Sequence, residues 1–308
     1  MTAIALRGRF PDCAWNDSDF ARNDTGEGND TALQGQGENG YNGWQKRDGG
    51  GERMRRMTWR MLVLLLCLLL AAGAAAGEES PNVPEDFVLR HGDRNSPKIA
   101  ITVDDCYKSA REWIERDVEL CREYGIGMTF FPLVYTGCLE EKYRDLWQSV
   151  IDSGCEIGTH TYSHLKMGNR DRWGIIGALG KAQEALDKTL GYHYPIRWLR
   201  PPYGTVAKGK KSSEKNVIAA IRLFGFDHIV HWDVSETKDL KKALGDIQNG
   251  SILLFHAKKK DTRFLEKLIP QLKERGFEMV TVSELFGYAL PEAGGEMYVY
   301  DKEQYRDN

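Results

Sequence analysis

Short apolar runs alternate with segments of helical periodicity from about residue 98 onward. The apolar runs predict strands at 99–103, 128–132, 156–159, 196–199, 227–231, 251–255 and 278–281. Apolar residues three or four positions apart predict helices between them, at 109–124, 143–153, 172–190, 213–224, 240–247 and 262–275. Alternating strands and helices with short connections are typical of a parallel sheet built from βαβ units. About seven repeats indicate a closed or nearly closed (β/α) barrel, with a doubly wound open sheet as the alternative.

A basic segment and a long apolar run precede this pattern and differ from it. Arginines are frequent at 53–60, and the apolar run at 61–76 ends in small residues. This order is typical of a secretory signal peptide, and the run is shorter than the ~20 residues of a membrane-spanning helix. We therefore expect cleavage near Ala76 and a secreted or cell-envelope protein, with an uncleaved N-terminal anchor as the alternative.

The segment before the basic run is rich in Gly, Asn and Asp, without apolar periodicity, so we expect it to be disordered. Because a signal peptide begins near the N-terminus, we hypothesise that translation starts at Met54 or Met57. The chain then divides into a disordered segment upstream of the true start (1–53), a signal peptide or anchor (54–76), a linker (77–97), a catalytic domain (98–288) and a polar tail (289–308).

The net charge limits the partners that we expect, and the cysteine spacing limits the metal sites that we expect. The formal net charge of -3 gives no indication of a nucleic-acid partner, and we expect membrane contact only through 54–76 and a monomeric protein. The spacing of the four cysteines in the expected mature part matches no zinc-finger pattern. We expect free, partly buried thiols at Cys106, Cys121, Cys138 and Cys155.

Unusual polar residues follow several of the predicted strands. They are Asp104, Asp105, His160, Arg200, Asp233 and His256. Catalytic groups of (β/α) barrels gather at the C-terminal ends of the strands, so we expect these side chains to share one face. His160 and His164 are four residues apart, and a helical turn would bring them to about 5–6 Å at Cβ. With a carboxylate they form a metal site, whereas alone they are more typical of surface histidines.

These residue types suit metal-assisted hydrolysis. A metal held by Asp105, His160 and His164 polarises a carbonyl and activates water. Asp104 then remains free as a general base. Arg200 is expected to orient it, a structural salt bridge being the alternative. His256 is expected to protonate the leaving group, with a packed core histidine as the alternative.

The chain from about 98 to 286 resembles the NodB-type polysaccharide deacetylases, carbohydrate esterase family 4. The family motifs T-F-D-D-G, H-x-x-x-H, R-P-P-[YF]-G, a D-W stretch and L-x-H occur here in order, at 102–106, 160–164, 200–204, 232–240 and 254–256. Val103 replaces Phe and Cys106 replaces Gly, which places a thiol beside the expected metal site. The fourth motif matches least, because Leu240 follows Asp239 where the family has Trp.

The resemblance implies a distorted (β/α)7-type barrel, usually zinc-dependent, that removes N-acetyl groups from an amino-sugar polymer such as peptidoglycan or chitin. Metal-bound water would attack the amide with Asp104 as base and His256 as acid, and Asp105, His160 and His164 would hold the metal. Arg200 would orient the base. Asp233 would pair with His256, Asp239 being the alternative. Substrate would contact Pro202, Tyr203, Trp232 and Leu254, with the Tyr203 backbone N–H helping to hold the oxyanion. A non-catalytic carbohydrate-binding relative and a deacylase of a small amide are the alternative functions.

Overall fold

The computed structural model describes residues 86–206 and 211–306. The expected disordered segment 1–53, the expected signal peptide 54–76 and residues 77–85 of the expected linker lie outside the described residues. No helix within the described ranges is long and apolar enough to cross a membrane.

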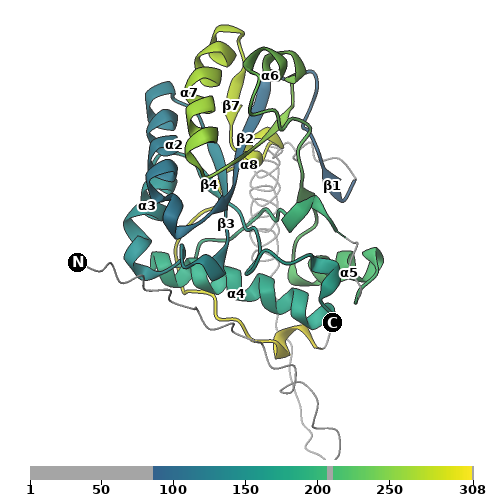
Figure 1. Ribbon diagram of the computed structural model, residues 1–308. Coiled ribbons are helices and arrows are strands. Elements are labelled where there is room, and N and C mark those ends of the chain that lie inside the picture. The colour runs from purple at the N-terminus through teal and green to yellow at the C-terminus, as the bar shows by residue number, and fades with distance from the viewer. Residues whose placement is uncertain (1–85, 207–210, 307–308) are drawn as a thin grey trace, which may run out of the picture. The chain divides into compact units, whose positions relative to one another are not determined.

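Parallel strands alternate with helices along the described chain (Figure 1). The strands are β1 (Val88–Leu89), β2 (Lys98–Cys106), β3 (Met128–Pro132), β4 (Glu156–Ile157), β5 (Ile229–Val230), β6 (Ile252–His256) and β7 (Glu278–Val280). The α-helices are α2 (Arg111–Tyr124), α3 (Arg144–Asp152), α4 (Arg172–Leu190), α5 (Glu214–Phe224), α6 (Leu240–Asp246), α7 (Lys259–Glu274) and α8 (Val282–Leu285). The short 3₁₀ turns include η2 (Lys108–Ala110) and η6 (Pro202–Gly204).

The strands form a distorted barrel. One sheet has the order β4-β3-β2-β6, with β7 pairing the start of β2, and β1 pairs β5 separately. Single parallel bridges join the two parts, because Leu199 pairs with both Thr159 and Ile229, and Val234 pairs with Leu253. These bridges close the ring, which confirms the predicted (β/α) barrel and excludes the open sheet.

Strand β2 lies at the centre of the sheet and has two different faces. Its residues Ile99, Ile101 and Val103 pack in the core cluster that also contains the buried sides of α2 and α7. Ala100, which has the opposite orientation, packs with Phe131 and Trp198 in a second cluster. Since side chains alternate along a strand, Thr102 and Asp104 share the face of Ala100 and point into the barrel.

The domain begins earlier than predicted. Within the expected linker 77–97, β1 pairs with β5, and Leu89 is 1% exposed. Two apolar residues between polar neighbours are too short to show a period in the sequence. The predicted strand 196–199 is also wrong in extent, because only Leu199 forms a bridge there.

The expected polar tail packs on the domain rather than extending from it. The ring of Tyr300 lies directly against Gly180 of α4, and Tyr305 stacks on Phe224 of α5. The backbone N–H of Tyr298 donates to the buried Asp187 carboxylate at 2.7 Å. The tail therefore covers the α4–α5 side of the barrel.

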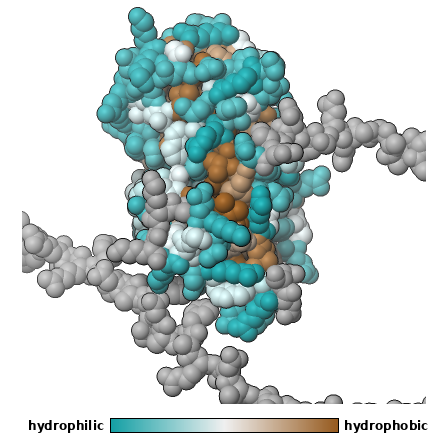
Figure 2. Space-filling view, turned by 90° about the vertical axis from the view of Figure 1, so that its right-hand side faces the viewer, coloured by the Kyte–Doolittle hydropathy of each residue, from teal (hydrophilic) through white to brown (hydrophobic). Residues whose placement is uncertain are grey.

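The surface is mostly hydrophilic where it can be seen. Figure 2 shows the side of the molecule that lies to the right in Figure 1, with one hydrophobic strip between hydrophilic residues. Some of the partly buried hydrophobic residues of the domain belong to this β1 and α5 side, among them Phe87, Val88, Ile218 and Leu223.

The four thiols are free, as predicted, and they are more fully buried than expected. Cys106 packs in the core cluster of α2 and does not project toward the site, contrary to what its motif position suggested. Burial is the largest cause that raises the pKa of the Cys106 thiol well above its ordinary value. It is therefore a core residue and not a reactive group.

Candidate metal centre and active site

A bulge at the end of β2 separates its two acidic residues. The pairing with β3 shifts register between Val103 and Cys106, and Asp105 adopts a left-handed φ of 55°. A bulge turns consecutive side chains away from strict alternation. Asp104 therefore keeps its place inside the barrel, while Asp105 turns toward the loop after β4.

That loop carries His160 and His164, and it is not helical as the spacing had suggested. Thr161 has a left-handed φ of 72°, and its hydroxyl donates to the carbonyl of Ser163 at 2.8 Å. The resulting turn still brings the two imidazole rings together, with centroids 5.2 Å apart. The expected proximity is confirmed, and it is reached through a non-helical turn.

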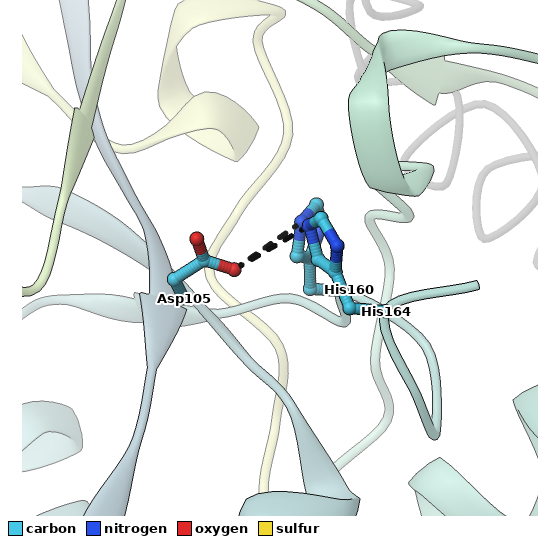
Figure 3. Close-up of side chains that lie close together, drawn as sticks. All are labelled: Asp105, His160 and His164. Atoms are coloured by element: carbon cyan, nitrogen blue, oxygen red, sulfur yellow. Dashed lines mark ion pairs between the residues drawn. The ribbon is translucent and has the colours of Figure 1, made fainter. Parts of the chain in front are cut away.

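The carboxylate of Asp105 points at both rings (Figure 3). Its Oδ1 lies 3.6 Å from Nε2 of His164 and 3.8 Å from Nε2 of His160, and the three ligand atoms all lie within 4.8 Å of one another. Tetrahedral zinc with bonds near 2.1 Å would hold its ligand atoms about 3.4 Å apart. A small inward adjustment of the three side chains therefore suits a divalent metal.

Two further observations fit a metal at this position. The buried Oδ1 of Asp105 has no hydrogen-bond partner within the described part of the chain. Nδ1 of His160 donates to the carbonyl of Arg200 at 2.7 Å, which leaves Nε2 with a free lone pair facing Asp105. Burial lowers the pKa of His160, against the opposing effect of Asp104, so the ring is neutral as a ligand must be.

Asp104 lies next to this group but is held by a different partner. Its Oδ1 accepts from Nη1 of Arg200 at 2.9 Å, and its Oδ2 is 4.0 Å from Nε2 of His160. Arg200 is fully buried and also donates to the Thr102 hydroxyl and to the carbonyls of Val230 and His231. These hydrogen bonds hold the Arg200 guanidinium in one position. It therefore fixes Oδ1 of Asp104, and Oδ2 remains on the side of His160.

Backbone strain is concentrated at this site. Within the described ranges, Asp105, Thr161 and Tyr203 are the non-glycine residues with positive φ. Such conformations cost of order 1–3 kcal/mol each and persist where the surroundings enforce them. All three residues lie at or beside the proposed metal ligands, since the Tyr203 ring contacts His164 edge-on at 4.4 Å.

The other expected substrate contacts surround the same opening. Tyr203 is 57% exposed, and the preceding Pro202 is buried. The guanidinium carbon of Arg200 lies 5.7 Å from the ring centroid of Trp232. Leu254 pairs with Thr102 in the β2–β6 register and so shares the inner face of β6 with His256. The structure therefore brings these residues to one side of the barrel.

The prediction that Asp233 pairs with His256 is wrong. Because Val234 is in register with Leu253, Asp233 lies beside the first residues of β6, whereas His256 ends that strand. The Asp233 carboxylate accepts from Arg94 at 2.8 Å, from the Ser251 hydroxyl and from the Ile252 backbone. Asp239, the alternative, caps α6 by accepting from the Lys242 backbone.

The carboxylate that contacts His256 is Asp261, which the sequence reasoning missed. Oδ2 of Asp261 lies 3.4 Å from Nδ1 of His256 and accepts from the His256 backbone N–H at 2.9 Å. The helix was predicted to begin at Thr262, but α7 begins at Lys259 and places Asp261 in its first turn. An acidic residue five positions after the histidine was the available signal.

A cavity of about 270 Å³ lies beside Asp105 and His256. It is lined by Asp105, Tyr107, Ser109, Ala110, Trp113, His256, Ala257 and Lys258. A group bound in this cavity would lie beside both Asp105 and His256.

Comparison with known proteins agrees with this geometry. A polysaccharide deacetylase family model matches residues 91–226. A peptidoglycan-N-acetylglucosamine deacetylase of Bacillus cereus is 28% identical over 202 residues, 63% of this chain and 70% of that protein. The peptidoglycan-N-acetylglucosamine deacetylase PgdA of Listeria monocytogenes is 28% identical over 207 residues, 64% of this chain and 40% of that protein, so the match spans less than half of this relative.

A solved structure of a carbohydrate esterase family 4 pseudoenzyme from Bacillus anthracis has the same fold. Its TM-score is 0.56 at 22% identity, covering 66% of this chain and 70% of that chain. The matched range includes Asp104, Asp105, His160, His164 and Arg200, which the structure brings together. Residues 91–226 therefore match the polysaccharide deacetylase family, and the fold resembles that of a carbohydrate esterase of family 4.

Proposed function

We propose that this protein is a metal-dependent hydrolase that removes N-acetyl groups from an amino-sugar polymer, most plainly peptidoglycan. The observation that carries the proposal is the buried Oδ1 of Asp105, which has no hydrogen-bond partner in the described ranges and faces Nε2 of both His160 and His164. The names of the similar deacetylases from Bacillus cereus and Listeria monocytogenes support peptidoglycan as the polymer.

Asp105, His160 and His164 would hold the metal, with zinc as the candidate. When bound there, a divalent metal supplies Lewis-acid activation of water and of the amide carbonyl. Asp104, oriented by Arg200, takes a proton from the attacking water. Arg200 keeps this carboxylate in position, because its guanidinium is fully buried and hydrogen-bonded on several sides.

His256 completes the reaction from the other side of the opening. As the bond between the acyl carbon and the nitrogen breaks, the nitrogen takes a proton from the imidazolium of His256, because an amide anion is a poor leaving group. Acetate and a free amine are the products. The exposed Tyr203 contributes its backbone N–H to the developing oxyanion, and Pro202, Trp232 and Leu254 contact the acetyl group.

The location of the protein is part of the same proposal. The basic and apolar segment 54–76 lies outside the described residues and suits export to the cell envelope, where peptidoglycan is found. Zinc remains the preferred metal because one carboxylate and two imidazoles leave an open coordination position.

The decisive experiment measures acetate released by the full chain, loaded with zinc, from purified peptidoglycan and from N-acetylglucosamine oligomers. We expect release from peptidoglycan that a chelator abolishes and added zinc restores. Asp105→Asn serves as the matched inactive variant. Binding of the polymer without acetate release, as expected for a pseudoenzyme, would overturn the catalytic proposal. Release from chitin oligomers alone would change the substrate.

A further inference from the structure

His256 is bound to the start of α7 by a single carboxylate oxygen. Oδ2 of Asp261 accepts from the His256 backbone at 2.9 Å, lies 3.4 Å from Nδ1 of its ring, and lies 3.6 Å from Nζ of Lys258. The Asp261 side chain is 1% exposed. Burial alone would raise the pKa of Asp261, but the bonds from His256 lower it overall, so this carboxylate is ionised.

Several buried polar atoms lie behind Asp261 without a partner. Within the described part of the chain, no hydrogen bond is made by Oδ1 of Asp261, either carboxylate oxygen of Asp117 or the hydroxyl of Thr262. Asp117 lies on α2, which packs beside α7 (Figure 1). Buried polar atoms without partners are rare because each loses its hydrogen bonds to water, so a proton or an ordered water must join this group.

Asp117 is the group that can supply the proton. Burial raises the pKa of Asp117 to about 8; the nearby Thr262 hydroxyl opposes this, and the charge of Asp261 adds to it. At neutral pH Asp117 therefore carries an O–H donor, and Asp261, whose charge acts on Asp117, has a buried oxygen without a partner in the described part of the chain.

We propose that Asp261 is the positioning carboxylate of the catalytic His256, and that Asp117 holds Asp261 in place from behind by donating to it. The inference rests on the proposed function for its catalytic meaning. With Nδ1 facing Asp261, the opposite ring nitrogen, Nε2, is left to face the cavity and deliver the proton to the departing amine. The other charged or titratable groups near the ring are Lys258 on its own loop and Asp104, Asp105 and Tyr107 from β2 and the turn after it.

Kinetics on the zinc-loaded full chain test the first part. Asp261→Asn keeps the shape but removes the charge, so we expect kcat to fall about tenfold or more, a share of the ~10²–10⁴-fold that general acid catalysis contributes, with KM and zinc content unchanged. Asp246→Asn, which removes an exposed carboxylate from α6, should leave kcat unchanged. An unchanged kcat in Asp261→Asn, or the same fall in Asp239→Asn, would overturn the proposal.

A spectroscopic measurement is independent of activity. Nitrogen-15 NMR of the metal-free protein, with the His256 signals assigned from His256→Gln, should show the neutral ring protonated on Nδ1. In Asp261→Ala we expect a mixture of the two tautomers. A wild-type ring protonated on Nε2 would overturn the inference. An inactive wild type with the expected tautomer would instead contradict the proposed function alone.

A pair of substitutions tests Asp117. Asp117→Asn retains an N–H donor of the same shape, so kcat should stay within about twofold of wild type. Asp117→Leu has a similar size but no donor, and we expect it to lower kcat toward the level of Asp261→Asn while thermal unfolding shows a folded protein. Equal kcat values in the two variants would remove Asp117 from the proposal.

Discussion

At the scale of residues, the site depends on two adjacent aspartates, Asp104 and Asp105, that contact different partners. Asp104 bonds Arg200 inside the barrel, whereas Asp105 faces the two histidines because of the bulge at the end of β2. The two carboxylates are adjacent and chemically identical, so only this geometry separates the expected roles of base and ligand. Substitution by Asn can distinguish them.

We predict that Asp104→Asn retains zinc and loses roughly 10²–10⁴-fold or more in kcat, the range of general-base catalysis. Asp105→Asn should lose zinc, and activity with it. Metal analysis alongside acetate release checks both, with the exposed Asp145→Asn as control. Equal zinc loss in the two variants would mean that both acids bind the metal.

The buried Glu156 gives a pH dependence of stability. Its carboxylate accepts from Thr129 and from the backbone and hydroxyl of Ser283, yet burial outweighs these bonds and raises its pKa from 4.5 to about 7. The folded state therefore binds the proton more tightly than the unfolded state. This contribution is fully present below pH 4.5 and is lost as the pH rises toward 7.

We predict that Glu156→Gln flattens this dependence, so that between pH 5 and 8 the variant loses less unfolding free energy than wild type, by at most about 3 kcal/mol. Urea unfolding at a series of pH values measures the slope. Asp117 titrates with the same sign, so some slope should remain. A variant slope as steep as that of wild type would show that Glu156 does not carry the effect.

At the scale of elements, the short strand β1 sets the boundary of the domain. β1 contains two residues, but its backbone pairs with β5 and Leu89 fills the interior of the barrel beside Ile252 and Val230. The backbone of Leu89 also accepts from His231, next to the site. The segment before residue 98 is therefore part of the fold.

We predict that Leu89→Ala lowers the unfolding free energy by about 2–5 kcal/mol, as cavity-forming substitutions in a packed core do. Denaturant unfolding of the full chain measures this, and Val299→Ala, at an exposed position of the C-terminal segment, should change little. If Leu89→Ala were as stable as the control, β1 would be only loosely attached to the barrel.

At the scale of the whole molecule, the metal group joins parts of the chain that are distant in sequence. Asp105 ends β2, His160 and His164 follow β4, and Arg200, whose carbonyl accepts from His160, follows the Leu199 bridge. Single bridges close this part of the barrel, so a bound metal would tie its loops together. A ligand that binds only the folded state stabilises it by mass action.

We predict that free zinc at 100 times its Kd raises the unfolding free energy by about 2.7 kcal/mol, with a matching rise in Tm. His164→Ala should abolish the rise without lowering the Tm of the metal-free protein much, because His164 is part-exposed. His228→Ala, a histidine away from the group, should behave as wild type. A zinc-dependent rise retained in His164→Ala would contradict the ligand assignment.

Much of the fold was predictable because the spacing of apolar residues is a local property of the sequence. The helix at 172–190 and the strand at 128–132 were predicted with the bounds the structure has. Asp105, His160 and His164 were predicted to meet, and they do. Two-residue strands such as β1 have no period to detect, so β1 escaped prediction. The strand at 196–199 was predicted too long, because pairing there is limited to Leu199 and depends on partners far away in sequence.

The sequence by itself determined the alternation of strands and helices, and the residue types at the end of each strand. Only the tertiary structure decided which carboxylate meets His256. The register between Val234 and Leu253 carries Asp233 to the wrong end of β6, and the early start of α7 brings Asp261 to His256 instead. Strand register between distant segments is set by packing and hydrogen bonding across the whole barrel, which no local pattern contains.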